Sequence, residues 1–585
     1  MTGTPSGPAS VAASAPRWRT AVMWTVLLAL YLVLRVPGLL GNSATYDEPI
    51  YIGAAKHFAL LHDDRAAAML YHPTLSYHLM DLPLWFLDTP LRAWDPAGAN
   101  TQVGLDVLYE STFRGAPVAP ETVLLLARLP ILLVGLLGLP LMFALGRRLG
   151  GDAAGWLSAL AWATFPEAAA QSIQATTDCV AAVAALGLAV AALRFVEAVR
   201  DADASVRTRH WALAVLGVAT GLALLAKHTL LVHVAVVAVA LWVLRVMTVR
   251  RFLVAAGIAG FVVWAGYLFE FRTPLPPSGP HETLDQVARV LGVAPSALEG
   301  PARAIPFPAP TYARSVADAL FSKATARAGT PWTAYMDGEW SPKGFWLYFP
   351  YATLVKTPAS LLVLVAVGLL GLRRLVAERR GAALLVLALF TVPFAAAVTS
   401  RLNIGFRHLL PTLPFLFVLG LAGLMQIRGW RGMRAVVVGC VLLLSYEMGS
   451  APRDPIPFAN VFAGGPDQLH LRLADSNLEV GQDLGRVAAW ARANDVRKIT
   501  AFLHGPPGLF ERECARNPVF EAMDVAPTGG TLWLMKAEDQ KGPIPKDRLL
   551  AVGESVMLTP RWRQWLLDMP PLAQVGRTRI YALPR

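Results

Sequence analysis

Long apolar runs separated by short basic loops are the feature that most constrains this chain. The first run extends from Val22 to Leu40, and ten more follow before residue 451. Runs of about 17–25 apolar residues are long enough to cross the hydrocarbon core of a bilayer. Only 16% of the 585 residues are charged, against roughly a quarter in soluble proteins. The sequence therefore predicts a polytopic α-helical membrane protein.

We expect about eleven transmembrane helices. Their expected ranges are 22–40, 122–145, 153–171, 178–197, 211–227, 229–245, 252–270, 352–372, 382–399, 407–426 and 433–450. The boundary at Lys227 and His228 matters most, because reading 211–245 as one helix would invert everything downstream.

The arginine clusters give this topology an orientation. If the N-terminus is cytoplasmic, every short basic cluster falls in an inner loop, at 147–148, 194–209, 245–251, 373–380 and 428–434. Cytoplasmic loops are enriched in Lys and Arg. We therefore interpret the net charge of +12 as a sign of membrane topology and not of nucleic-acid binding.

Composition also suggests the domain boundaries. We expect a disordered cytoplasmic N-terminus at 1–21, a membrane domain at 22–450 and an extracytoplasmic soluble α/β domain at 451–585. Two long outer loops, 41–121 and 271–351, exceed the length of simple connectors.

Within these outer segments the apolar periodicity predicts several elements. We expect short helices on the membrane surface at 79–94 and a helical patch near 283–298. In the tail we expect helices at 480–494 and 560–567, and strands at 498–503 and 531–535. The three cysteines are far apart and indicate neither a disulfide framework nor a zinc site.

Acids and bases from distant segments converge on the outer face of this topology. They are Asp47, Glu48, Asp178, Lys227, His228, Lys356, Arg407 and His408. Singly, each has a simpler interpretation: a solvated loop for the two adjacent acids, a snorkelling lysine for Lys227, a helix-end residue for His408. As a set they combine proton acceptors with cations that could neutralise a departing phosphate.

The location of this set of residues limits the kind of sugar donor that the protein could use. A phosphate-linked donor at the outer face implies a lipid carrier, since a soluble nucleotide sugar would need a cytoplasmic site. No His or Asp cluster has the spacing of metal ligands. No cofactor is therefore required, although two acids could share a divalent cation.

The order of several motifs resembles a known family. The chain is similar to GT-C fold glycosyltransferases that use polyprenyl-phosphate sugars, in particular the protein O-mannosyltransferases (glycosyltransferase family 39) and the aminoarabinose transferases that modify lipid A. The resemblance covers nearly the whole chain. Its motifs are Tyr46-Asp-Glu-Pro49, His72-Pro-Thr-Leu-Ser-Tyr77, Ala127-Arg-Leu-Pro130, the segment at Asp178, Gly221-Leu-Ala-Leu-Leu-Ala-Lys227, Tyr348-Phe-Pro350, Lys356-Thr-Pro358, Asn403-Ile-Gly-Phe-Arg-His-Leu-Leu-Pro411, Phe462-Ala-Gly-Gly-Pro466 and Asp475-Ser-Asn-Leu-Glu-Val-Gly-Gln-Asp-Leu484.

The resemblance implies roles for these residues. Asp47 matches the catalytic base with Glu48 as its neighbour, and Asp178 matches a second acid. His72 stands where relatives place a basic residue near the lipid phosphate, and as a histidine its charge depends on pH. The further donor phosphate or sugar contacts implied are Lys227, Lys356, Arg407 and His408.

These expectations combine into a multi-pass glycosyltransferase of the cell (inner) membrane. It would move a sugar from a polyprenyl-phosphate carrier to a protein, lipid or glycan acceptor on the extracytoplasmic face, with inversion. The alternatives are a flippase or transporter of a lipid-linked sugar, which predicts an inverted repeat and charges at mid-span, and a non-catalytic binding partner.

Overall fold

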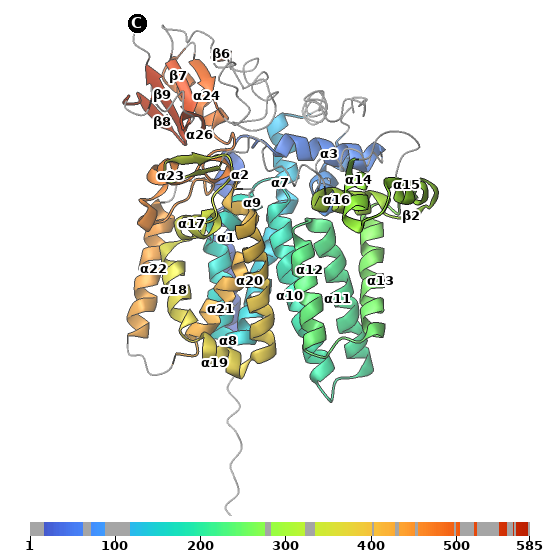
Figure 1. The fold of residues 1–585 in the computed structure, drawn as a ribbon. Helices are drawn as coiled ribbons and strands as arrows, with labels where there is room; N and C mark the ends of the chain where they lie inside the picture. The colour runs from blue at the N-terminus through green and yellow to red at the C-terminus, as the bar shows by residue number, and fades with distance from the viewer. Residues whose placement is uncertain are drawn as a thin grey trace, which may run out of the picture.

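A computed structural model gives the fold as a helical bundle with a small sheet at one end (Figure 1). The structure describes residues 17–61, 72–87, 118–274, 282–321, 334–400, 403–427, 432–450, 454–496, 499–503, 520–522, 549–558, 566 and 569–582. The segment 1–16 of the expected N-terminal tail lies outside these residues. Arg17 to Ala21, expected to be disordered, instead form the start of the first helix.

The bundle consists of long helices that run between the two ends of the molecule and of short helices that lie at these ends (Figure 1). They are α1 (Arg17–Val33), α2 (Val36–Gly41), α7 (Pro120–Leu136), α8 (Gly138–Thr164), α9 (Pro166–Ser172), α10 (Asp178–Arg200), α11 (Val206–Ala226), α12 (Leu230–Val243), α13 (Val249–Gly266), α17 (Tyr348–Lys356), α18 (Ala359–Leu369), α19 (Leu372–Glu378), α20 (Arg380–Thr399), α21 (Leu413–Leu424) and α22 (Met433–Ser450). Within the described chain, six helical stretches are long and apolar enough to cross a membrane, or up to seven if a bent pair counts as one span. This agrees with the predicted polytopic helical protein.

Two helical hairpins lie where the sequence places span boundaries. The apolar stretch Pro120–Thr164 turns back at Gly151, whose φ of 81° is not helical. The indole of Trp162 then donates to the carbonyl of Gly135 at 2.8 Å, so the two arms pack side by side. Likewise α11 ends at Ala226 and α12 begins at Leu230, which confirms the predicted boundary at Lys227 and His228.

Several expected spans are not continuous helices. The span expected at 153–171 is interrupted at Phe165, between α8 and α9. The span expected at 352–372 is wrong as a single helix, because α17 and α18 meet at an angle of 114°. Pro358 cannot donate a helical hydrogen bond and holds the preceding Thr357 in an extended conformation. The helix expected at 22–40 breaks after Val33, and the one expected at 407–426 begins only at Leu413.

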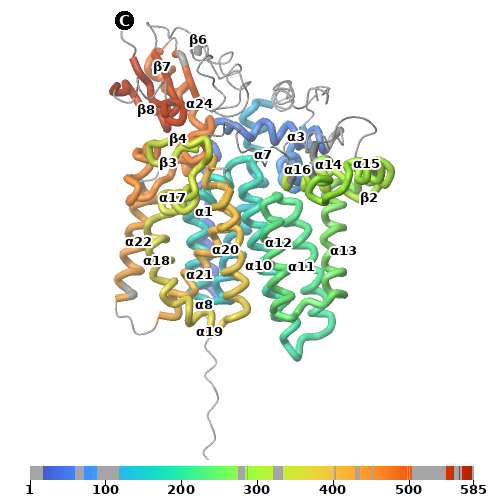
Figure 2. The backbone as a smooth tube through the Cα atoms, viewed as in Figure 1, coloured from blue at the N-terminus to red at the C-terminus, as the bar shows by residue number. Residues whose placement is uncertain are grey.

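Short helices and hairpins cover the end of the bundle that also carries the sheet (Figure 2). They are α3 (Glu48–Leu61), α5 (Leu75–Asp81), η1 (Leu82–Phe86), α14 (Glu282–Leu291), α15 (Pro295–Ala304), α16 (Pro310–Phe321) and the strands β1 (Phe271–Arg272), β2 (Phe307–Pro308), β3 (Ala334–Met336) and β4 (Glu339–Ser341). The expected short helices near 79–94 and 283–298 are therefore present, apart from residues 88–94, which lie outside the described part.

The tail contains a mixed five-stranded sheet, on which the helix α24 (Leu484–Ala493) and the short helix α26 (Glu554–Met557) pack. Its other elements are η4 (Val461–Ala463), η5 (Pro466–Gln468), α23 (Leu469–Arg472), η6 (Asp475–Asn477), β5 (Ile499–Phe502), β6 (Phe520–Ala522), β7 (Leu549–Gly553), β8 (Ala573–Val575) and β9 (Thr578–Ala582). The strand order is β6-β5-β7-β9-β8, with β5 parallel to both neighbours and β9 antiparallel to β7 and β8. The strand expected at 531–535 lies outside the described residues, as does the helix expected at 560–567 except for Leu566.

The basic loops lie at the opposite end of the bundle from this sheet. Arg148 pairs with Glu197 near the end of α10, and Arg200 donates to the carbonyl of Leu244 after α12. Arg374 in α19 donates to the carbonyl of Gln426, just after α21. Since α10 starts at Asp178 and ends at Arg200, the bundle separates the arginine clusters from the outer acids by its full length.

Glycines allow α18 and α21 to approach through their backbones. A Cβ added at Gly368 would overlap the carbonyl oxygen of Gly420, and one at Gly371 would overlap that of Gly423. Small residues at such crossings are how membrane helices pack without a hydrophobic driving force.

We expect Gly368→Ala to destabilise the protein by about 1–3 kcal/mol, because the extra methyl forces the two helices apart. The melting temperature of the detergent-solubilised protein measures this. Gly439→Ala on α22 is the matched control, since nothing lies within 4 Å of the added carbon. An unchanged melting temperature in Gly368→Ala would contradict the close crossing.

Candidate active site

Four chain segments meet at the sheet end of the bundle and bring acids and bases together. Asp47 immediately precedes α3, Asp178 opens α10, Lys227 follows the last residue of α11, and Arg407 lies in the 3-10 helix η3 (Phe406–Leu409). A carboxylate at a helix N-terminus and a cation at a C-terminus are both favoured by the helix dipole. The ends of the helices therefore place these charges.

Two ion pairs organise the site. Arg407 Nη1 lies 2.7 Å from Asp47 Oδ2, and Lys227 Nζ lies 2.6 Å from Asp178 Oδ1. The side chain of His408 interacts electrostatically with Lys227, Asp178 and Arg407. Asp47, from the loop after the first expected span, thus lies in one cluster with residues of the fourth, fifth and tenth expected spans.

His72, which precedes α5, also belongs to this cluster. Its ring meets Tyr51 edge-on, with centroids 5.7 Å apart. Burial lowers the pKa of His72 well below its ordinary value, and the nearby Lys227 lowers it further, against the opposing effect of Asp178. His72 is therefore neutral at pH 7 in the protein without ligand.

Several buried polar atoms of the cluster have no hydrogen-bond partner among the described residues. They are His72 Nδ1, both ring nitrogens of His228, Arg407 Nε and His408 Nε2. Buried polar groups normally have a partner. These nitrogen atoms surround the Arg407–Asp47 and Lys227–Asp178 ion pairs. Such a site suits an anionic ligand, whose oxygen atoms would accept hydrogen bonds from the nitrogens that carry protons.

Access distinguishes the three acids that the sequence suggests. The side chain of Asp47 is 23% exposed, that of Asp178 only 4%, and that of Glu48 0%. Of these three, Asp47 is the one that an acceptor group can reach. The position of Asp178 suits holding Lys227 rather than direct contact with an acceptor.

Glu48 is bound on all sides by the protein. Its carboxylate pairs with Arg128 at 2.6 Å and accepts from the amides of Thr45 at 2.8 Å and Ala175 at 2.7 Å. Arg128 also donates to the carbonyls of Asn42 and Ser43, at 2.9 and 3.0 Å. This arrangement gives Glu48 a structural position beside Asp47. Arg128 lies in the sequence motif Ala127–Pro130, which by itself did not predict this contact.

Lys356 also has protein partners. Its ammonium donates to the carbonyls of Ile456 at 2.7 Å and Asn477 at 2.8 Å, and it lies 3.7 Å from a carboxylate oxygen of Glu167. The side chain is only 1% exposed. Lys356 therefore joins the tail to the bundle, and the structure does not bring it to the Asp47 cluster.

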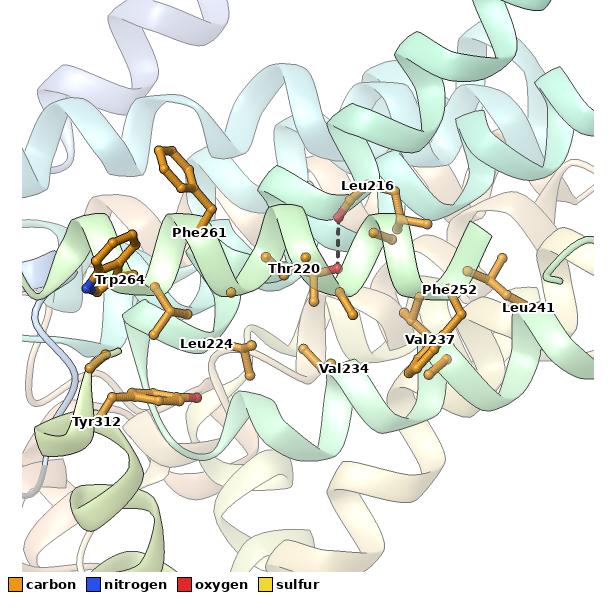
Figure 3. Close-up of a pocket in the computed structure, with 18 of the residues that line it drawn as sticks. Leu216, Thr220, Leu224, Val234, Val237, Leu241, Phe252, Phe261, Trp264 and Tyr312 are labelled. Atoms are coloured by element: carbon orange, nitrogen blue, oxygen red, sulfur yellow. Dashed lines mark hydrogen bonds between the residues drawn. The ribbon is translucent and has the colours of Figure 1, made fainter. Parts of the chain in front are cut away.

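The helices next to the cluster enclose an apolar groove of about 750 Å³ (Figure 3). It lies between α11, α12 and α13 and is covered at one end by Tyr312 of α16. The ring of Tyr312 lies 6.1 Å from that of His228, the neighbour of Lys227. The hydroxyl of Thr220 in the groove is satisfied by the carbonyl of its own helix at Leu216. The lining is therefore suited to a hydrocarbon chain.

The described residues contain no group of three or more His, Cys, Asp or Glu side chains that could hold a metal ion. In the cluster, both Asp47 and Asp178 face a cationic side chain instead.

Comparisons with known proteins were made over the whole chain. No protein-family model matches, and no curated protein sequence matches. Among solved structures, the chain is similar to ArnT from Cupriavidus metallidurans in the apo state, with 15% identity, a TM-score of 0.47 and coverage of 97% of this chain and 98% of that one. It is also similar to the oligosaccharyltransferase AglB from Archaeoglobus fulgidus in complex with an inhibitory peptide and a dolichol-phosphate, with 13% identity, a TM-score of 0.45 and coverage of 82% and 58%.

We expect Glu48→Gln to destabilise the protein by about 3–5 kcal/mol, because it leaves the buried guanidinium of Arg128 without its counter-ion. Thermal melting and the yield of monodisperse protein measure this. Asp152→Asn is the control: it breaks the exposed pair with Arg147, whose side chains are 62% and 68% exposed, and such pairs contribute about 0–1 kcal/mol. A stable but inactive Glu48→Gln protein would instead indicate a chemical role for Glu48.

Proposed function

We propose that this protein is an integral membrane glycosyltransferase that transfers a sugar from a polyprenyl-phosphate carrier to an acceptor. Three features together carry the proposal: an accessible carboxylate, a cluster of side-chain nitrogens without a partner among the described residues, and an apolar groove whose Tyr312 end lies next to His228. A base, a phosphate site and a lipid site are the parts that this reaction needs. The motif resemblance in the sequence favours the same reaction class.

The groove is the part that favours a lipid carrier. Its volume of about 750 Å³ lies within the roughly 300–1,000 Å³ typical of ligand sites. A hydrocarbon chain lying in this groove with its phosphate at the Tyr312 end would place that phosphate near His228 and Lys227. The polar atoms of the side chains labelled in the groove (Figure 3) are the hydroxyls of Thr220 and Tyr312 and the indole nitrogen of Trp264. The Thr220 hydroxyl and the Trp264 indole already donate to the backbone carbonyls of Leu216 and Glu270, so the groove offers few polar partners to a nucleotide.

In the proposed reaction Asp47 acts as the general base. It accepts the proton of the acceptor hydroxyl or amine while that atom attacks the anomeric carbon. The bond between this carbon and the phosphate oxygen breaks, and polyprenyl phosphate departs with the electron pair. A single displacement of this kind inverts the anomeric configuration.

The cations stabilise the charge that develops on the departing phosphate. Lys227 and Arg407 are close to the cluster's unpartnered nitrogens, and His72 and His408 add hydrogen-bond donors when they carry protons on the facing atoms. Asp178 holds Lys227 in place through its 2.6 Å contact. Preorganised charges of this kind do not have to reorient during the reaction.

We propose that the bundle crosses the membrane eleven times. In this count each arm of the hairpin at Gly151 is one span, and each of the shorter helices α12, α21 and α22 is one span. The basic loops would then face the cytoplasm. The site and the tail would face the outer side of the cell membrane. Protein, lipid and glycan acceptors all fit a site at that face.

We expect Asp47→Asn to lower the transfer rate by about 10²–10⁴-fold, the usual contribution of a general base. Asp178→Asn should raise the donor KM as well, because it frees Lys227. The assay follows a labelled sugar from a polyprenyl-phosphate donor to candidate acceptors. Asp337→Asn is the control, since this acid lies on an exposed turn 52% accessible to solvent.

The same assay separates the alternatives. Wild-type activity in a folded Asp47→Asn protein would overturn the base assignment. Movement of the labelled donor between leaflets without transfer would indicate a flippase, and donor binding alone would indicate a non-catalytic partner.

We expect donor binding to strengthen as the pH falls from 8 to 6. The pKa of His72 is lowered in the free protein, and a bound phosphodiester, which keeps one negative charge over this range, raises it again. Protonation of His72 and binding of the donor therefore favour each other between pH 8 and pH 6. His72→Gln should flatten the pH dependence of the donor Kd, whereas His210→Gln, near the basic loops, should leave it unchanged. An identical pH dependence in His72→Gln would exclude His72 from the phosphate site.

A further inference from the structure

The loop that carries Arg407 lies on a segment of the tail. Ser476 donates to the carbonyl of Ile404 at 2.6 Å, and a Cβ added at Gly405 would overlap the hydroxyl of Ser476. The side-chain oxygen of Asn477 accepts from the amide of Phe406 at 2.9 Å. Asn477 itself is 1% exposed, so this contact is shielded from water.

The same asparagine is held from the other side. Its Nδ2 donates to the hydroxyl of Tyr348 and to the carbonyl of Ala474, both at 2.8 Å. Its own carbonyl accepts from Lys356 at 2.8 Å. With these bonds the side chain has one fixed orientation, which determines where the amide of Phe406 must lie.

The loop that carries Asp47 is bound to the next turn of the same segment. The amide of Tyr46 donates to the carbonyl of Val480 at 2.8 Å, and the amide of Ser43 donates to that of Gln482 at 3.0 Å. The amide of Gly485 in turn donates to the hydroxyl of Ser43 at 2.8 Å. The tail therefore binds the backbone of the Asp47 loop as well.

These two attachments flank the Asp47–Arg407 ion pair. Tyr46 is adjacent to Asp47, and Phe406 is adjacent to Arg407. The two charged residues are 360 positions apart in the chain. Through Asn477 and Val480, three residues apart, one tail segment binds the neighbour of each.

We propose that the tail segment Asp475–Asp483 is a clamp that sets the position of Asp47 relative to Arg407, and that Asn477 is its positioning residue. Asn477 would act through the backbone of Phe406 and not by contact with substrate. The kinetic consequence rests on the proposed function, while the structural consequence does not. Catalytic groups displaced by about 1 Å can lose roughly 10²-fold in rate.

The test compares two buried asparagines of the tail. Asn477→Ala removes the bond to Phe406. Asn460→Ala is the matched control: Asn460 is 0% exposed, donates to the carbonyls of Leu354 and Thr357 at 2.6 and 2.7 Å, and accepts from Ala463 at 3.0 Å. Both variants lose buried hydrogen bonds, but only Asn477 binds the Arg407 loop.

We expect both variants to melt at lower temperature, and only Asn477→Ala to lose at least about tenfold in kcat, with the donor KM within about threefold of wild type. Asn477→Asp, which keeps an oxygen for the Phe406 amide, should recover part of the kcat without recovering the melting temperature. If Asn477→Ala and Asn460→Ala both keep the kcat of wild type, Asn477 is only structural and the clamp is overturned.

Amide hydrogen exchange tests the clamp without any assay of transfer. Peptides covering 404–407 and 43–47 should exchange faster in Asn477→Ala than in wild type, and not in Asn460→Ala. If wild type transfers no sugar while this pattern is found, the proposed function fails and the clamp stands. If exchange in both peptides is unchanged by Asn477→Ala, the clamp fails whatever the activity.

Discussion

The buried ion pair between Arg128 and Glu48 is the interaction on which the rest of the site depends. Both side chains are almost completely shielded from water, at 1% and 0% exposure, where separating the charges would be costly. The pair connects α7 to the residue beside Asp47, and the amide of Ala175 extends it towards Asp178. Both Asp47 and Asp178 are therefore adjacent to backbone positions that this buried ion pair holds in place.

The charged side chains of the bundle are concentrated at its two ends. The basic loops lie at one end, the bundle interior is sealed by close helix contacts such as that of α18 with α21, and the acid–base cluster lies at the other end. The tail connects distant parts of the chain beside this cluster, because it forms hydrogen bonds with both the Asp47 loop and the Arg407 loop. The tail therefore contacts the site through roughly the first thirty residues after α22.

Much of this arrangement follows from local patterns in the sequence. Apolar runs and arginine clusters predicted the bundle and its two ends, and the break at Lys227 was visible as a charged pair between two runs. The bend at Thr357 could have been inferred from Pro358. Arg128 was harder, because a single arginine in an apolar run looks the same whether it faces lipid or a buried partner. The role of Asn477 depends on contacts with residues more than seventy positions away, which no periodicity reveals. Strand β5 likewise pairs with β7, where Ile499 lies opposite Leu549, fifty positions further along the chain.

The position of the groove between α11, α12 and α13 determines the route by which a ligand would reach it. Its rim side chains Trp242, Phe252 and Phe261 are 42–58% exposed on the flank of the bundle, so the groove adjoins the bilayer rather than the surrounding water. A ligand entering there arrives by lateral diffusion in two dimensions. Its occupancy then depends on its mole fraction among the lipids of one leaflet. Dilution of the cell suspension would leave that occupancy unchanged, whereas expansion of the membrane area would reduce it.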